Sequence, residues 1–165
     1  MSIIYDKYPE TRLLVIGGGR QLKYLQETYG HLEYIQFLGS VPYQNSNDYI
    51  NCFDIALLPK QGLDDIGYSP IKLYAYAAAG RAILASDIRG IKELEPNKFL
   101  RLHQPGNSQD LAAKAIEMIS HPEQLSQMGM IAREYAEQHF SWKLVTDKII
   151  QAMENYDLQE QLGNE

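Results

Sequence analysis

The chain has 165 residues, of which 45% are apolar and 22% charged, and its formal net charge at pH 7 is −6. Its length and composition predict about one globular domain, and the acidic charge makes nucleic acid and anionic membrane surfaces poor candidate partners. The single cysteine, Cys52, excludes an internal disulfide, and the lack of a signal peptide or a membrane-spanning apolar run predicts a cytoplasmic protein.

Strands and helices alternate along the chain. Short apolar runs have the continuous hydrophobicity of strands covered on both faces, at residues 12–16, 34–38, 55–58, 82–85 and 99–102. The segments around them predict helices, at residues 2–8, 21–29, 45–52, 70–79, 91–94, 108–120, 122–139 and 142–158. This order predicts an α/β domain over residues 1–158, with a parallel sheet of about five strands between helices. Residues 159–165 are expected to form a polar tail.

The stretch from residue 55 to 86 is the centre of this pattern, because it reads as strand, loop, helix and strand, which is a βαβ unit. Ser69 supplies an N-cap oxygen, Pro70 suits the first helical position, and Gly80 suits the end of the helix. The free N–H groups of this helix start face the crevice outside the strand ends, where they attract anions. Lys72 is either an indifferent surface charge or a phosphate partner, and its convergence with Ser69 and Pro70 favours phosphate.

Two other loops follow predicted strands and are candidates for ligand contact. Glycines 17–19 join a strand to a helix, as in a phosphate cradle. GGGR has neither a spaced GxGxxG nor a P-loop ending, so a simple tight turn is equally open. Arg89 and Gly90 follow the strand at 82–85, at the same crevice, and are candidate second phosphate contacts. The histidines have no metal-ligand spacing and predict surface or capping positions, so we expect no metal and no cofactor: His31, His103, His121 and His139.

Six segments follow one another in order between Arg12 and Trp142, so that they are spread along nearly the whole chain: RLLVIGGG, YIQFLGSVP, FDIALLP, SPIKLYAYAAAGRAILASD, IRGIKEL and HFSW. Together they resemble the C-terminal, donor-binding half of a GT-B glycosyltransferase of the retaining group 1 family. The resemblance implies a Rossmann-like three-layer α/β/α fold that binds a nucleotide-diphosphate sugar for glycosyl transfer in glycan or polysaccharide biosynthesis. It places the donor against one set of residues: Gly18, Gly39, Ser69, Pro70, Ile71, Lys72, Ala75, Arg89 and Gly90. Trp142, which heads the last helix, is expected to be a packing anchor rather than a ligand stack.

The sequence departs from this family at two glutamates that lie eight residues apart in it. The alignment of KLYAYAAAG places the second, which commonly holds the donor ribose, at Ala75, and the first, which contacts the sugar, at Gly67. Losing a hydrogen bond to a charged group costs about 1.5–3 kcal/mol. That is roughly ten- to a hundredfold in affinity, which weakens donor binding without excluding it. Asp64 and Asp65 are nearby substitutes for the Gly67 role, although loop aspartates are usually just solvated.

The second departure is larger. The family's half opens with a strand, a glycine turn and a helix whose Arg and Lys meet the diphosphate, and this chain begins where that helix would end. The missing strand belongs between the strands at 12–16 and 55–58, which must pair directly or leave their edges open. The N-terminal acceptor domain is missing too. We therefore expect a fragment, a truncated reading frame or one part of a split enzyme, inactive alone. An acceptor domain or partner chain would complete it and make any membrane contact.

Two other hypotheses remain open. The first is a non-catalytic domain that has lost donor binding and acts as a partner or scaffold for a complete transferase, which Gly67 and Ala75 favour. The second is a flavodoxin-like or other phosphate-binding α/β module. It is weaker, because the glycine turns fit no dinucleotide fingerprint.

Overall fold

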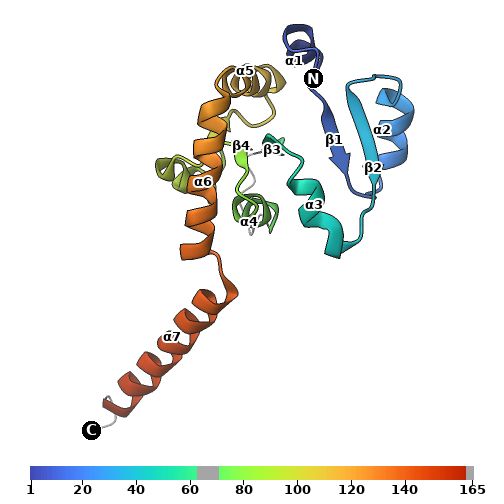
Figure 1. Cartoon of the computed structure of the whole chain (residues 1–165). Helices are drawn as coiled ribbons and strands as arrows, with labels where there is room; N and C mark the ends of the chain where they lie inside the picture. The colour runs from blue at the N-terminus through green and yellow to red at the C-terminus, as the bar shows by residue number, and fades with distance from the viewer. Residues whose placement is uncertain (63–70, 163–165) are drawn as a thin grey trace.

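The computed structural model describes residues 1–62 and 71–162. Its strands are β1 (Leu13–Ile16), β2 (Ile35–Gly39), β3 (Ile55–Leu58), β4 (Ala82–Ser86) and β5 (Leu100–His103). Its α-helices are α1 (Ser2–Lys7), α2 (Leu22–Tyr29), α3 (Ser46–Ile50), α4 (Ile71–Ala78), α5 (Ser108–Ile119), α6 (Pro122–His139) and α7 (Trp142–Leu162). Two 3₁₀ helices, η1 and η2, are Tyr43–Asn45 and Lys92–Asn97. The predicted α/β fold of parallel strands with flanking helices is confirmed (Figure 1).

The strands form two separate parallel sheets. β1 pairs with β2, and β4 lies between β3 and β5 in the other sheet. Figure 1 shows β1, β2 and α2 standing apart from the part built on β3 to β5. Of the two outcomes expected for a missing strand, direct pairing of β1 with β3 does not occur. The edges of β1 and β3 that face away from their own sheets are open, and the strands do not form one continuous sheet.

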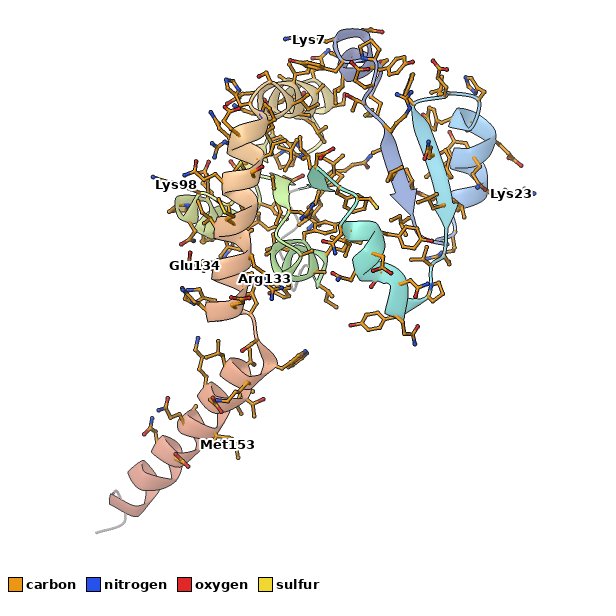
Figure 2. The ribbon with its side chains drawn as sticks, viewed as in Figure 1. Lys7, Lys23, Lys98, Arg133, Glu134 and Met153 are labelled. Atoms are coloured by element: carbon orange, nitrogen blue, oxygen red, sulfur yellow. The ribbon has the colours of Figure 1, made fainter. Side chains whose placement is uncertain are left out.

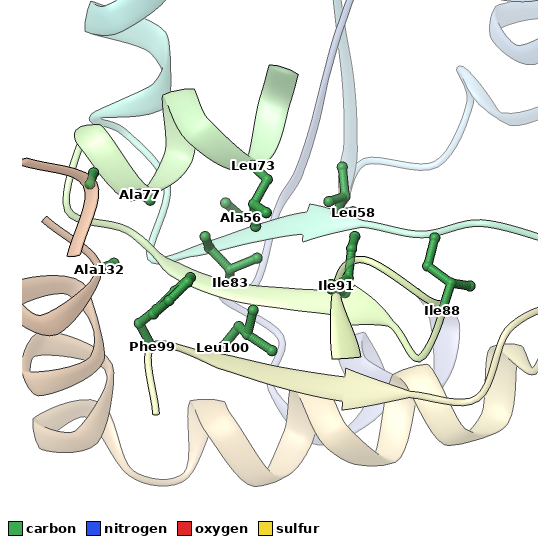
Figure 3. Packing of buried hydrophobic residues seen from close by; sticks show 12 residues of the cluster. Ala56, Leu58, Leu73, Ala77, Ile83, Ile88, Ile91, Phe99, Leu100 and Ala132 are labelled. Atoms are coloured by element: carbon green, nitrogen blue, oxygen red, sulfur yellow. The ribbon is translucent and has the colours of Figure 1, made fainter. Parts of the chain in front are cut away.

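The three-stranded sheet carries the hydrophobic core on both of its faces. All five residues of the central strand β4 are buried, and alternate residues point to opposite faces. Ile83 and Ala85 belong to the cluster that includes α4 and part of α6, whereas Ala82 and Leu84 belong to the cluster that includes α5. Figure 3 shows the first cluster, with Phe99 pointing toward α6. The region around β3 to β5 therefore has a hydrophobic core of its own, which fixes the positions of the strand ends from which the loops extend.

Two glycines allow α4 and α6 to approach each other closely. Gly80 ends α4 with φ +65°, and its backbone carbonyl faces Gly129 in the middle of α6. A Cβ atom added to Gly129 would lie 2.2 Å from the Gly80 carbonyl oxygen, which is far inside van der Waals contact. The clash is with main chain, which cannot rotate aside as a flexible side chain can.

Replacing Gly129 with alanine is expected to lower the free energy of unfolding by about 1–3 kcal/mol, as overpacking of a closed contact does. Helix propensity alone would favour alanine by about 1 kcal/mol, so the sign of the change tests the clash. Urea denaturation followed by circular dichroism measures it. Gly19→Ala is the matched control, because a Cβ there meets no atom within 4 Å. A Gly129→Ala variant as stable as the parent would contradict the close helix contact.

Helix α7 extends away from the rest of the chain (Figures 1 and 2). The predicted cap is present, since the Leu144 N–H donates to Ser141 Oγ at 3.2 Å. Two expectations were wrong: the helix continues to Leu162 rather than ending near 158, and Trp142 is 85% exposed rather than packed. Exposed apolar side chains recur three or four residues apart on this helix, at Trp142, Val145, Ile149 and Met153. Within residues 1–62 and 71–162, no helix has the length and hydrophobicity that a membrane span requires.

Candidate functional site

A large cavity lies between the two sheets. Its volume is about 1570 Å³, and β1 and β3 contribute opposite parts of its wall. Its wall includes residues of β1, β3, α4 and α6, among them Leu13, Val15, Ile55, Leu57, Lys72, Ala75, Tyr76, Leu125 and Met130. Most of these side chains are apolar, and two parallel strand edges open toward the same space. The arrangement is therefore a large, mostly apolar cavity beside two open strand edges, with a cationic side chain at α4.

The first turn of α4 brings a positive charge to this cavity. Lys72 is exposed, lines the cavity, and pairs with no carboxylate in the described part of the chain. Ile71, the first residue of α4, is also exposed. Ser69 and Pro70, the predicted N-cap and first helical residue, lie outside the described residues, as do Asp64, Asp65 and Gly67. An exposed lysine in a first helical turn has no favourable interaction with the helix dipole, which leaves it available to an anion.

Ala75 lies on the same wall, one turn after Lys72. It is half-buried and lines the cavity together with Lys72 and Tyr76. The Tyr76 ring packs edge-on against Phe53, with ring centroids 6.2 Å apart, and this contact holds the middle of α4 against the segment before β3. A methyl group at position 75 gives the cavity no hydrogen-bond acceptor there. The departure from a glutamate therefore falls on the cavity wall itself.

Gly18 and Gly39 lie together at the carboxyl ends of β1 and β2. The Gly17 N–H donates to the Gly39 carbonyl at 2.8 Å, and Gly39 has φ +67°. A Cβ atom on Gly18 would lie 2.0 Å from Ser40 Oγ but 3.4 Å from Ser40 Cβ, so it would require only the serine hydroxyl to rotate aside. The tight-turn interpretation of GGGR stays open beside ligand contact, and ligand contact at Gly18 and Gly39 stays a prediction.

Arg89 and Gly90 form the loop after β4. Arg89 is exposed, and Gly90 has φ +83°, a conformation that favours glycine. The Gly90 N–H donates to Glu93 Oε2 at 2.6 Å, so a phosphate bound to this amide would have to displace a carboxylate. Because β3 and β4 are parallel neighbours, the loops that follow them, with Arg89–Gly90 in one and α4 after the other, lie at the same edge of the sheet.

The structure brings together some predicted site residues and leaves others apart. Lys72 and Ala75 share one cavity wall, whereas Gly18 and Gly39, at the strand ends of the other sheet, do not line that cavity, and neither do Arg89 and Gly90. His103 corrects the expectation of surface or capping histidines, because it is only 3% exposed at the end of β5. Its burial arises from strand pairing with Ser86, which residue spacing along the chain does not reveal. Among the described residues, no group of His, Cys, Asp and Glu side chains could hold a metal ion.

Sequence comparison identifies one family along most of the chain. The family model described as "Glycosyl transferases group 1" matches residues 1–121. Phosphatidyl-myo-inositol mannosyltransferase of Mycobacterium leprae is 25% identical over an alignment of 162 residues, which covers 93% of this chain and 42% of that protein. The chain therefore spans less than half the length of this relative.

Solved structures agree on the fold. Sucrose-phosphate synthase of Thermosynechococcus elongatus is similar with a TM-score of 0.77 and 17% identity, over 94% of this chain and 41% of that one. Anabaena HepE in complex with UDP and glucose gives a TM-score of 0.74 at 18% identity, over 94% of this chain and 44% of that one. The fold is part of the GT-B architecture. The family match and the fold agree, and the chain belongs to the group 1 glycosyltransferases.

Proposed function

We propose that this chain is the donor-binding half of a retaining glycosyltransferase. It would bind a nucleotide-diphosphate sugar for glycosyl transfer in glycan or polysaccharide biosynthesis. The observation that carries the proposal is the exposed Lys72, which lines the cavity in the first turn of α4 and pairs with no described carboxylate. The solved complexes of HepE with UDP and with UDP-glucose, which share this fold, support the same ligand class.

The proposed diphosphate position is the start of α4. Backbone N–H groups at a helix start combine with the helix dipole to bind anions, and Lys72 adds a full charge there. Arg89 extends from the loop after the neighbouring strand and supplies a second cation at the same sheet edge. Ser69, Pro70 and Ile71 are proposed as further contacts near the phosphates, with Gly18 and Arg89–Gly90 framing the cleft. Gly39 is proposed as a further donor-sugar contact.

We further propose that an acceptor domain or a partner chain completes this half. Three observations support it: the unpaired edges of β1 and β3, the apolar cavity between them, and the exposed apolar stripe of α7. Open strand edges and exposed apolar stripes are features that proteins normally cover. In this arrangement the reacting groups are divided between two parts, so this chain alone turns over no substrate.

Replacing Lys72 with alanine is expected to weaken nucleoside-diphosphate binding by at least about fivefold, because a charged contact with phosphate contributes about 1.5–3 kcal/mol. The melting temperature should not change, since the side chain is exposed. Lys23→Ala is the control: it removes an exposed lysine of α2, paired with Glu27 at 3.9 Å, and does not line the cavity. Equal affinities for Lys72→Ala and Lys23→Ala would remove Lys72 from the site.

A non-catalytic partner or scaffold is the second candidate function, and Ala75 favours it, because the wall of α4 offers the ribose no carboxylate. The two candidates differ in one observable. A donor-binding half binds a nucleoside diphosphate saturably, whereas a scaffold that has lost the donor site does not.

A further inference from the structure

A buried serine–histidine pair lies where the strands of the larger sheet end. Ser86 is the last residue of β4 and His103 the last residue of β5, and they are register partners. Ser86 is 0% exposed and His103 3% exposed, and Ser86 Oγ lies 3.2 Å from His103 Nε2. Neither side chain is among the residues proposed to contact the nucleotide-diphosphate sugar.

The surrounding hydrogen bonds determine which ring nitrogen of His103 carries the proton. The Nδ1 atom of His103 forms a 2.9 Å hydrogen bond with the backbone carbonyl oxygen of Gln104. A carbonyl oxygen can only accept a hydrogen bond, so Nδ1 must carry the proton and donate it. In the neutral ring Nε2 then accepts, and the Ser86 hydroxyl is the donor beside it. His103 is thus assigned to the Nδ1–H tautomer, with its buried Nε2 lone pair satisfied by Ser86.

Ser86 also holds a backbone segment that leaves the neighbouring strand. The Lys60 N–H donates to Ser86 Oγ at 2.7 Å. The Lys60 carbonyl, 3.2 Å from the same hydroxyl, accepts from the Gly106 N–H at 3.1 Å. The hydroxyl has one proton and two acceptors within reach, the Lys60 carbonyl and His103 Nε2. The carbonyl already accepts from Gly106, whereas the buried Nε2 depends on this hydroxyl, so the proton is assigned to the bond with Nε2. Lys60 is two residues beyond β3, on the connection that leads to α4.

We propose that Ser86 and His103 are positioning residues that anchor the Lys60 backbone and so set where the β3–α4 connection leaves the sheet. His103 orients the hydroxyl, and the hydroxyl accepts the Lys60 N–H, so these hydrogen bonds join the carboxyl ends of β4 and β5 to the segment just after β3. The consequence for nucleotide affinity rests on the proposed function. The anchoring of Lys60 and the tautomer of His103 do not.

The test compares the full chain with Ser86→Ala, Ser86→Thr and Ser120→Ala. Ser120 is the matched control, because its hydroxyl lies 3.0 Å from His121 Nδ1 in a second, exposed serine–histidine pair that does not bond Lys60. Long-range ¹H–¹⁵N spectra report the His103 tautomer, amide hydrogen exchange reports the protection of the Lys60 N–H, and calorimetric titration with UDP, GDP and ADP reports nucleotide affinity.

We expect the Nδ1–H tautomer of His103 in the parent chain. Lys60 exchange should be at least tenfold faster in Ser86→Ala and near the parent rate in Ser86→Thr and Ser120→Ala. Nucleotide affinity should fall several-fold in Ser86→Ala alone.

Contrary results separate the two claims. An Nε2–H tautomer or an unprotected Lys60 amide in the parent chain overturns the anchoring, even if Ser86→Ala does not fold. Faster Lys60 exchange with unchanged nucleotide affinity in Ser86→Ala overturns the positioning role. If the tautomer and exchange agree with expectation but the parent binds none of the three nucleotides, the anchoring is supported and the proposed function fails.

Discussion

Replacing Phe99 with alanine is expected to lower the free energy of unfolding by about 3–5 kcal/mol, the usual cost of truncating a buried aromatic side chain. Phe99 is 0% exposed and stacks on Tyr135 of α6, with ring centroids 5.0 Å apart. It belongs to the cluster that joins α4, β4 and α6 (Figure 3). Small domains are stable by only about 5–15 kcal/mol, so the loss should be a large part of the total.

Urea denaturation of the parent and the variant measures this loss, provided that the two unfolding curves have the same m-value. Tyr43→Ala is the control, because Tyr43 is an aromatic residue that lies exposed on η1, and its truncation should change the unfolding free energy by no more than about 0.5 kcal/mol. A Phe99→Ala variant within about 1 kcal/mol of the parent would mean that the core around β4 is not closed at Phe99.

Replacing Ala75 with glutamate is expected to tighten nucleoside-diphosphate binding by roughly ten- to a hundredfold, since a hydrogen bond to a charged group contributes about 1.5–3 kcal/mol. Ala75 lies on the cavity wall one turn from Lys72. In the proposed site, a carboxylate at this position accepts from a ribose hydroxyl of a nucleotide whose phosphates meet Lys72. The change restores the acceptor that the family resemblance places at this position.

Ala78→Glu is the control for this gain. It adds the same charge to the same helix, at an exposed residue that does not line the large cavity. Calorimetric titration of the parent and both variants with one nucleotide gives the comparison. If Ala75→Glu binds no more tightly than Ala78→Glu, either Ala75 is not the ribose position or the nucleotide does not occupy this wall.

Elements with strong local signals could be predicted from the sequence alone. The continuous apolar run at β3 gives its observed bounds of Ile55–Leu58, and Pro122 marks the first residue of α6. Ser141 caps α7 as expected. These features depend on a few neighbouring residues, through strand hydrophobicity and helix capping.

Features that depend on pairing between distant segments were only partly predictable. The split of the sheet was one of two outcomes left open by the missing strand. The burial of His103 follows from its partner Ser86, which is 17 residues away. η2 extends to Asn97, past the predicted end near Leu94, and ends there because Lys98 takes a left-handed conformation with φ 64°, which the local sequence pattern does not predict. Trp142 is exposed because α7 extends away from the rest of the chain (Figure 1), an arrangement that the residue pattern of the helix does not predict.

Calorimetric titration of the full chain with UDP, GDP and ADP would decide whether the cavity wall at α4 belongs to a nucleoside-diphosphate site, as proposed. We expect saturable binding of one of the three nucleotides, with about one site per chain, and weaker binding of that nucleotide by Lys72→Ala. A chain shown to be folded by circular dichroism that gives no binding heat with any of them at millimolar concentration would contradict this proposal. The scaffold function would then be favoured.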